Sequence, residues 1–355
     1  GYLPITLDLT TAGCQTGDTC VVAVMADNSN DKSYPPGKPQ YTLDFAYHGG
    51  IYRDAWMIVK NRAAITDALE ANTVAGGGVF IHYGEISEQK AQLFIDTEVK
   101  NEHPNPRKLT LEILVRSPQG KVVSTLRSPV TLKKNQSYTV KQATTIAKPQ
   151  RWSPETPALY QVDIRLLEKG KPIDGGMVRT GIRKAEFRGA DGFFLNDQPY
   201  KALIGGNRHQ DFAYIGNAMP NSMQWRDARL LKDAGFNIIR TAHYPMDPSF
   251  MEACDELGLF VIVATPGWQY WNAAFEEMVH QNTRDIIRRD RNHTSVLLWE
   301  PILNETRFPL SFALKALEIT REEFPWPGAP LAAGDMHSEG IAEHYGVVYG
   351  WPHDD

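Results

Sequence analysis

The sequence has no long apolar segment and no excess of charge of one sign. Its net charge is −5, from 37 Lys and Arg against 42 Asp and Glu, without a long run of either sign. This balance argues against nucleic-acid and membrane partners and favours a neutral small molecule or polymer. No segment reaches the roughly 18 apolar residues that span a bilayer, and the first residues lack a signal-peptide pattern. We therefore expect a soluble chain, with any targeting peptide removed or upstream.

Cysteine is also scarce, with only three residues, which are too few for a disulfide scaffold. Cys14 and Cys20 are close enough in the sequence to pair. Cys254 lies on the apolar side of an expected helix, where we expect it to belong to the core. The cysteines leave the cellular compartment open.

The length of 355 residues predicts two or three domains, and the character of the sequence changes twice. Residues 1–77 suggest an all-β region, with strand-like stretches at Cys20–Asn28 and Gly49–Val59 separated by turn residues. Residues 78–184 contain about seven alternating apolar and polar segments joined by polar turns. This spacing predicts an immunoglobulin-like β-sandwich.

Strands and helices alternate from residue 185 to residue 355. One helix is expected around residues 221–235, and another at 247–258, where Asp247 can cap the start and Gly258 can end it. Repeated units with Val-, Ile- and Leu-rich strands predict a parallel sheet covered by helices, either doubly wound or closed as a barrel. Polar residues at the ends of several strands favour the (β/α) barrel, which has its chemistry there.

Six segments of the sequence resemble a known family, in the expected order and at about the expected separations. They are GGIYRD, RWSPETPALY, DGFFLNDQPYKALIGGNRHQD, LLKDAGFNIIRTAHYP, ACDELGLFVI and RDRNHTSVLLWEPILNE. The chain resembles glycoside hydrolase family 2 over nearly its whole length, most of all the bacterial β-galactosidases. The resemblance implies part of a jelly-roll sugar-binding domain (1–77), an immunoglobulin-like domain (78–184) and the first six strands of a (β/α)8 TIM barrel (185–355).

The resemblance gives Glu305 the role of the general acid/base, which protonates the leaving glycosidic oxygen and later activates water. We expect apolar walls around it to raise its pKa. The alternative is a glutamate paired with an arginine such as Arg307. Asn304 matches the residue that hydrogen-bonds the sugar 2-hydroxyl, or else it forms a turn at the strand exit. Glu300, earlier in the strand, is expected to be structural.

Five further residues match family positions around the sugar. His209 and His243 follow the first two barrel strands and would contact sugar hydroxyls. Arg240 matches the arginine that keeps the nucleophile ionised, with a plain ion pair inside the barrel as the alternative. Tyr349 matches the tyrosine that bonds the nucleophile, or it fills the barrel mouth. Asp44, from the first domain, would reach across to the sugar.

The resemblance has two gaps. Members that bind magnesium carry acidic ligands after the third barrel strand, and this sequence has none there, so we predict no metal and no cofactor.

Four aromatic residues could stack on sugars or simply line the cleft, namely Trp268, Tyr270, Trp271 and Trp351.

The second gap is that a retaining glycosidase needs another carboxylate about 5 Å from the first, which the family has after strand seven. The sequence stops after strand six and starts within the jelly roll. We therefore expect a piece of a larger polypeptide, inactive alone.

Three functions remain open at this stage. The chain belongs to a retaining exo-β-glycosidase, expected to be a β-galactosidase, to a β-glucuronidase or β-mannosidase, or to a non-catalytic carbohydrate-binding protein. Its expected partner is a carbohydrate, and homo-oligomer formation stays open. The compartment is either the bacterial periplasm, which we favour, or the cytoplasm.

Overall fold

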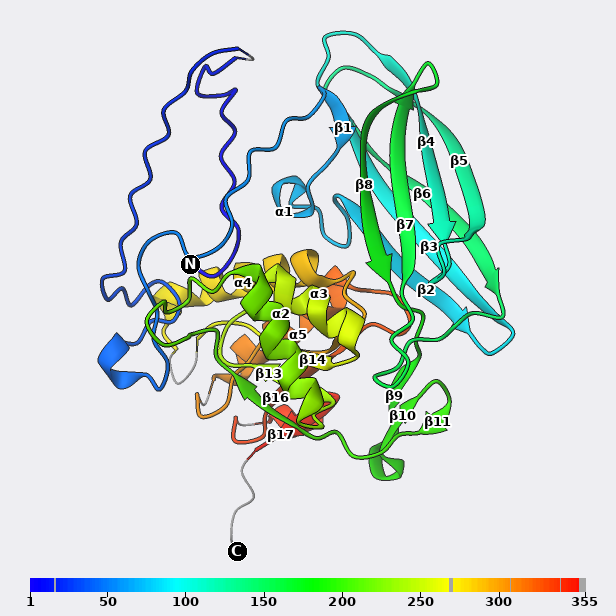
Figure 1. The fold of residues 1–355 in the computed structure, drawn as a ribbon. Coiled ribbons are helices and arrows are strands. Elements are labelled where there is room, and N and C mark those ends of the chain that lie inside the picture. The colour runs from blue at the N-terminus through cyan, green and yellow to red at the C-terminus, as the bar shows by residue number, and fades with distance from the viewer. Residues whose placement is uncertain (16, 268–270, 307, 339, 351–355) are drawn as a thin grey trace, which may run out of the picture.

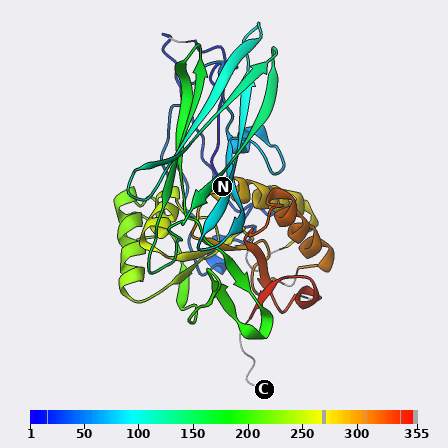
Figure 2. The ribbon, with the colours of Figure 1, turned by 90° about the vertical axis from the view of Figure 1, so that its right-hand side faces the viewer.

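The computed structural model describes residues 1–355 except 16, 268–270, 307, 339 and 351–355 (Figure 1). A β-sandwich stands above a helix-covered parallel sheet, and the N-terminal segment runs beside both (Figures 1 and 2). Among the described residues, no helix combines the length and the apolar character needed to cross a membrane.

The β-sandwich consists of two antiparallel sheets. One sheet contains β1 (Ala63–Ile65), β3 (Lys90–Asn101), β2 (Val79–Ile86) and β6 (Gln136–Ala147). The other has the order β5 (Val122–Leu132), β4 (Arg107–Arg116), β7 (Tyr160–Glu168) and β8 (Lys171–Thr180). The seven strands from β2 to β8 agree with the number predicted for this part of the chain.

Alternation along the strands produces the sandwich core. In β4, Leu109, Leu111, Ile113 and Val115 are all buried, because successive side chains point to opposite faces of a strand. They join one cluster with residues of β3 and β7. The apolar period of two therefore determines which face of each strand is buried.

A small antiparallel sheet follows the sandwich and precedes the parallel sheet. Its strands are β9 (Ala185–Phe187), β10 (Phe193–Leu195) and β11 (Gln198–Pro199), with a short 3-10 helix, η2 (Gly189–Asp191), between the first two. Phe193 packs edge-on against Phe260 of the parallel sheet, with ring centroids 5.7 Å apart. The small sheet thus covers part of the parallel sheet.

Six parallel strands form the third part, in strict sequence order. They are β12 (Gly205–Arg208), β13 (Ile238–Thr241), β14 (Phe260–Ala264), β15 (Val296–Glu300), β16 (Leu331–Asp335) and β17 (Val347–Tyr349). Neighbours in sequence are neighbours in the sheet, as in the first strands of a barrel. The predicted six parallel strands are present. The sequence SVLLWEPILNE predicts a strand over residues 295–305, but the observed strand is shorter, because it ends at Glu300 and residues 301–305 form a loop.

Helices α2 (Asn221–Asp233), α3 (Pro248–Leu257), α4 (Ala273–Asp290) and α5 (Leu310–Glu323) connect the strands, followed by the 3-10 helix η3 (Ile341–Glu343). The predicted signals hold at α3, since the Asp247 side chain accepts a hydrogen bond from the Ser249 N–H and Gly258 ends the helix at φ +76°. Cys254 is buried and free, as expected.

The segment before β1 differs from the prediction. No strand forms in its described residues, where the only regular element is the 3-10 helix η1 (Gln40–Thr42). Apolar residues in the stretches expected as strands are exposed, for example Val21 at 93% and Trp56 at 79%. Alternation predicts an extended backbone, but a strand also needs a partner to accept and donate its backbone hydrogen bonds. The chain here is extended without such a partner.

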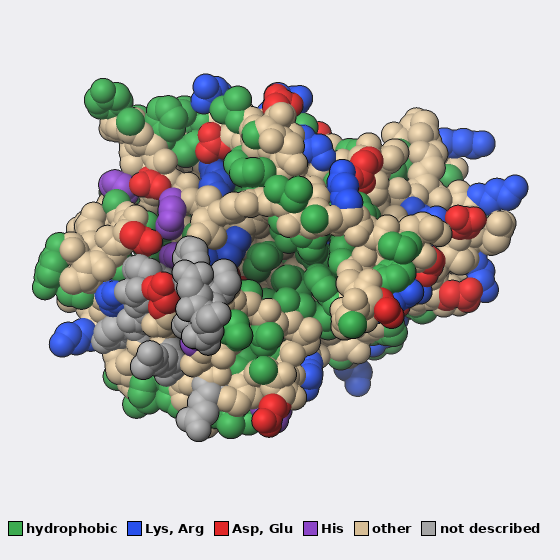
Figure 3. Space-filling model, turned by 90° about the horizontal axis from the view of Figure 1, so that it is seen from below, with side chains coloured by type: hydrophobic (Ala, Val, Ile, Leu, Met, Phe, Trp, Pro, Cys, Tyr) green, Lys and Arg blue, Asp and Glu red, His purple; other side chains and the backbone are tan. Residues whose placement is uncertain are grey.

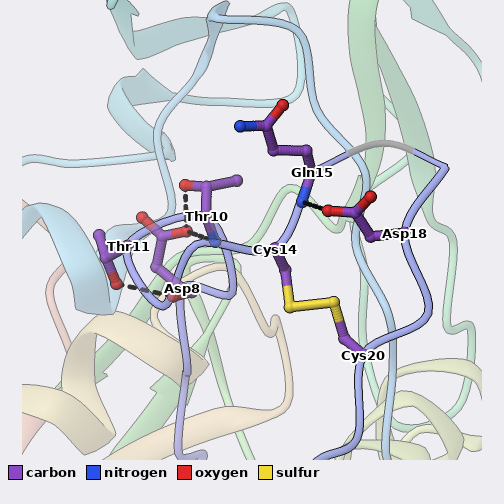
Figure 4. Close-up of a disulfide and its surroundings, with 7 residues drawn as sticks. All are labelled: Asp8, Thr10, Thr11, Cys14, Gln15, Asp18 and Cys20. Atoms are coloured by element: carbon purple, nitrogen blue, oxygen red, sulfur yellow. Dashed lines mark hydrogen bonds between the residues drawn. A yellow bond between two sulfur atoms is a disulfide. The ribbon is translucent and has the colours of Figure 1, made fainter.

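Local contacts shape this N-terminal segment instead. Cys14 and Cys20 form a disulfide, which confirms that the two can pair (Figure 4). Beside it, the Asp8 carboxylate accepts from the N–H and hydroxyl of Thr10, and Asp18 accepts from the Gln15 N–H (Figure 4). After β1, outside this segment, the short helix α1 (Ala68–Ala71) is capped by Asp67.

The sandwich docks on the amino ends of the parallel strands. The Trp152 indole N–H donates to the Asp255 carbonyl (2.9 Å), and the Arg183 guanidinium donates to the Thr294 carbonyl (2.7 Å). The Asp255 carboxylate also holds His293, at 2.7 Å from the ring Nδ1, and accepts from the Ser295 N–H. One aspartate therefore joins α3, the loop before β15 and, through its carbonyl, the sandwich.

This junction predicts a pH dependence of stability. Burial alone would lower the pKa of His293, but the Asp255 carboxylate outweighs it and raises the pKa above its usual value. A raised pKa in the folded state stabilises the protein fully below the unfolded pKa of about 6.5, and the contribution is lost as pH rises through the folded pKa. His293→Gln should therefore lower the urea midpoint of unfolding most below about pH 6. The difference from wild type should shrink as the pH rises.

Asp255→Asn serves as the paired variant, because it removes the charge that stabilises the imidazolium. In the Asp255→Asn background, adding His293→Gln should no longer cause a pH-dependent difference in the urea midpoint. A deficit of His293→Gln that grows with rising pH would contradict the assignment.

Candidate active site

Candidate residues meet at the carboxyl ends of the parallel strands. Because the strands are parallel, their carboxyl ends lie on one edge of the sheet. His209 and His243 follow β12 and β13, Glu300 ends β15, and Tyr349 ends β17. Figure 3 shows the molecule from below, where hydrophobic side chains gather in a hollow near the middle of the face.

A buried ion pair lies at the centre of this edge. Arg240 of β13 donates Nη2–H to Glu300 Oε1 (2.6 Å) and Nε–H to Glu300 Oε2 (2.8 Å). The Glu300 side chain is fully buried and that of Arg240 is 14% exposed. Burial raises the pKa of Glu300, Arg240 acts against this shift, and Asp335 adds to it. The bidentate geometry satisfies both carboxylate oxygens, as a buried charge requires.

The remaining hydrogens of the Arg240 guanidinium reach three other strands or loops. Nη1–H donates to Asn207 Oδ1 at the end of β12 (3.2 Å), and Nη2–H donates to Asn304 Oδ1 (2.8 Å). The Tyr349 hydroxyl lies 3.4 Å from Nη2, and the guanidinium carbon lies 5.4 Å from the tyrosine ring centre. Arg240 thus fixes the orientation of the Asn304 amide, whose oxygen is engaged.

This arrangement bears on the roles of Asn304 and Arg240. With its oxygen held by Arg240, Asn304 has its amide Nδ2 as the donor for a ligand hydroxyl. For Arg240, the structure shows the ion pair that was the alternative to a role beside the nucleophile. The partner is Glu300, and a role for Arg240 in supporting a nucleophile remains a prediction.

Glu305 lies in the loop that follows β15. Its backbone has φ +60°, and its N–H donates to Asp335 Oδ2 at 2.7 Å. The side chain is exposed, so the expected apolar walls do not enclose it among the described residues. The reason is that Ile302 and Leu303 turn into the core, at 0% and 1% exposure, once the strand has ended.

The two histidines contact one another and a phenylalanine of the N-terminal segment. The rings of His209 and His243 are 5.7 Å apart, and Phe45 lies 5.5 Å from the first and 5.8 Å from the second. Burial, and then the nearby charges of Arg240 and His209, together lower the pKa of His243 to about 2. His243 is therefore neutral at physiological pH, which suits an imidazole that donates and accepts hydrogen bonds with hydroxyl groups.

The same contacts bring Asp44 to this edge. Phe45 is buried, whereas Asp44, the preceding residue, is exposed. Tyr2 stacks on Tyr244 at 4.5 Å between ring centres, and Arg53 donates to the Pro245 carbonyl at 2.6 Å. The N-terminal segment therefore packs on the edge that carries the candidate residues.

Other predicted positions are less informative. Trp271 is 37% exposed, while Trp268, Tyr270, Trp351 and Arg307 lie outside the described residues. Within the described part of the chain, no cluster of three or more His, Cys, Asp or Glu residues is arranged to hold a metal ion.

Two residues at this edge were missed by the sequence analysis. Asp335 ends the strand of residues 331–335, and an acid at that position was a usable signal, because the neighbouring strands also end in polar candidates. Phe45 carries no such signal, since nothing in a local pattern reveals a contact with His209 more than 160 residues away.

Comparison with known proteins identifies the family. The profile "Glycosyl hydrolases family 2, TIM barrel domain" matches residues 189–321, and "Glycosyl hydrolases family 2" matches residues 78–183. Together they cover most of the chain, which belongs to glycoside hydrolase family 2, a family of enzymes that act on glycosidic bonds.

Curated relatives carry two names. A β-galactosidase of Thermoanaerobacter pseudethanolicus is 32% identical over 324 residues, which cover 91% of this chain and 41% of the relative. A putative β-glucuronidase of Formosa agariphila is 32% identical over 305 residues, 84% of this chain and 34% of the relative. This chain thus spans about two fifths or less of the length of these relatives.

Solved structures agree on the architecture. A Bacteroides uniformis β-glucuronidase covalently bound to cyclophellitol-6-carboxylate aziridine has a TM-score of 0.79 at 30% identity, with 90% of this chain and 39% of that chain covered. A putative β-galactosidase of Bacteroides fragilis has a TM-score of 0.77 at 26% identity, with 87% and 45% covered.

The buried ion pair makes a stability prediction. Glu300→Gln removes one charge and leaves Arg240 without its counter-ion, so the free energy of unfolding should fall by about 3 kcal/mol. Denaturant unfolding measures it. As a matched control, Glu318→Gln removes the acid of the exposed Lys315–Glu318 pair of α5 and should have no measurable effect. Equal effects of the two variants would show that burial of the Arg240 pair is not what matters.

Proposed function

We propose that this chain is part of a retaining exo-β-glycosidase, a β-galactosidase, with Glu305 as the general acid/base. The observation that carries the proposal is the Asn304–Glu305 pair at the carboxyl edge of a parallel sheet, in a chain of glycoside hydrolase family 2. In this proposal Glu305 protonates the departing oxygen and then deprotonates the water that hydrolyses the glycosyl-enzyme.

The neighbouring residues fit contacts to a sugar. Asn304 has its amide nitrogen available for the 2-hydroxyl, because Arg240 engages its oxygen. The neutral His243 and its neighbour His209 suit other hydroxyls, and the exposed Asp44 approaches from the N-terminal segment. Tyr349, beside Arg240, would contact the nucleophile.

The nucleophile itself is proposed to lie outside this chain. A retaining pair needs a second carboxylate about 5 Å from the first, free to attack the sugar. Glu300 and Asp335 are both fully buried, Glu300 in its pair with Arg240 and Asp335 under two backbone N–H groups, so neither suits attack. The proposal therefore concerns the complete polypeptide that contains this chain.

A β-glucuronidase is the second candidate, since several relatives and solved structures carry that name. Binding a glucuronide requires a cation for the sugar carboxylate. At the described edge, Arg240 is engaged by Glu300, Asn207 and Asn304. Because Arg240 is already engaged in these contacts, it does not provide the cation for a sugar carboxylate, which favours a neutral sugar as the substrate.

The substrate prediction follows from that charge balance. The complete protein should hydrolyse p-nitrophenyl β-D-galactoside with the highest kcat/KM among the β-galactoside, β-glucuronide and β-mannoside. Preference for the glucuronide by about 10-fold or more would transfer the proposal to the second candidate, because a buried charge contact is worth at least that much. Absence of turnover with all three glycosides would favour a non-catalytic carbohydrate-binding protein.

The mechanistic prediction concerns Glu305→Gln in the complete protein. Substrates with poor leaving groups need protonation of the departing oxygen, so their hydrolysis should slow by about 10²-fold or more. Activated aryl glycosides need no such help and should still form the glycosyl-enzyme, which then accumulates because no base activates water. Azide, which needs no deprotonation, should restore turnover and yield the β-glycosyl azide.

Two outcomes would contradict this assignment. Equal loss on activated and unactivated substrates without azide rescue would mean that Glu305 only shapes the site or is the nucleophile. An α-configured azide product would exclude a retaining mechanism.

A further inference from the structure

Asp335 is a fully buried carboxylate at the last position of β16. Its Oδ2 accepts the Glu305 N–H at 2.7 Å, and its Oδ1 accepts the His337 N–H at 3.2 Å. The second bond is local and typical of an aspartate that shapes its own turn. The first bond reaches a residue 30 positions earlier, in the loop after β15. Asp335 therefore joins two loops at the same edge of the sheet.

The backbone of Glu305 needs such support. Its φ of +60° lies in the left-handed region, which a residue with a Cβ adopts at a cost and keeps only where the surroundings hold it. In that conformation the Glu305 N–H points at Asp335, and a buried carboxylate is a strong acceptor for a backbone N–H. The bond fixes the peptide plane from which the Glu305 side chain extends.

The position of Asp335 is itself tightly set. Asp335 is paired with Tyr349 in the β16–β17 register, and the next N–H, of Met336, donates to the Tyr349 carbonyl at 2.8 Å. On the other side, Asp335 is close enough to Glu300 to raise the pKa of that residue. The carboxylate that holds Glu305 is therefore anchored by the sheet and not by a loop.

We propose that Asp335 is the positioning residue of the general acid/base, which it holds in reach of the glycosidic oxygen through the Glu305 N–H. This inference rests on the proposed function of Glu305. It adds a role for a residue that touches no substrate and acts through the backbone of the residue that does. A misplacement of about 1 Å in such a group costs on the order of 10²-fold in rate.

The test is the dependence of rate on the leaving group. In the complete protein, Asp335→Ala should lower kcat/KM for glycosides with poor leaving groups by about 30- to 100-fold, and for activated aryl glycosides by less than about 5-fold. Azide should partly restore turnover of the activated substrates. A residue with only a structural role would lower both classes equally, since it would reduce the amount of folded enzyme.

Two further variants control the experiment. Asp335→Asn keeps one acceptor oxygen for the Glu305 N–H and should retain most of the wild-type leaving-group dependence, even where Asp335→Ala folds poorly. Ser338→Ala changes a buried residue of the same loop whose hydroxyl makes no hydrogen bond among the described residues, and it should leave both substrate classes unchanged.

The outcomes separate this inference from the function on which it rests. If Glu305→Gln shows the leaving-group effect and azide rescue but the folded Asp335 variants lose both substrate classes equally, the positioning role is wrong and the function stands. If Glu305→Gln shows neither, the proposed function fails and the positioning role fails with it. A leaving-group effect in Asp335→Ala that Asp335→Asn largely removes supports the proposal.

Discussion

The buried pair of Arg240 and Glu300 is the constraint on which the carboxyl edge of the sheet depends. A guanidinium can lie inside the barrel only when its charge and its N–H groups are matched, and Glu300 supplies the charge from two strands away. The pair fixes β13 relative to β15 across β14. It then leaves Arg240 hydrogens for Asn207, Asn304 and Tyr349, so one side chain sets the geometry of four strand ends.

The N-terminal segment, which has no β-strand among its described residues, completes this edge. The residues before β1 form no strand in their described part, yet Tyr2, Phe45 and Arg53 are anchored on the loops after β12 and β13. Stacked aromatic rings and the partly buried Arg53 guanidinium supply the contact that backbone pairing does not. The sandwich docks at the opposite ends of the strands, through Trp152 and Arg183, so the candidate site and the domain junction are separate.

Much of the fold could be predicted from the sequence because its determinants are local. Asp247 and Gly258 bound α3 through their own backbone bonds, and alternation in residues 107–116 determines which face of β4 is buried. The strands expected at 20–28 and 49–59 do not form, because pairing is a property of two segments and alternation describes only one. For the same reason the pattern at 295–305 did not reveal that the strand ends at Glu300 and leaves Glu305 exposed.

The same distinction between local and long-range contacts applies to the candidate site. Asn304 and Glu305 could be proposed from a motif, since adjacent residues keep their spacing in any fold. The partner of Arg240 is 60 residues away, and the support of the Glu305 N–H is 30 residues away, so neither could be read from local spacing. Both partners are carboxylates at the ends of parallel strands. Glu300 ends β15, which does not adjoin the strand of Arg240, and Asp335 ends β16, the strand that follows the loop of Glu305. A search over strand-end acids, rather than over motifs, is therefore the physical route by which Glu300 and Asp335 could have been paired with the residues they hold.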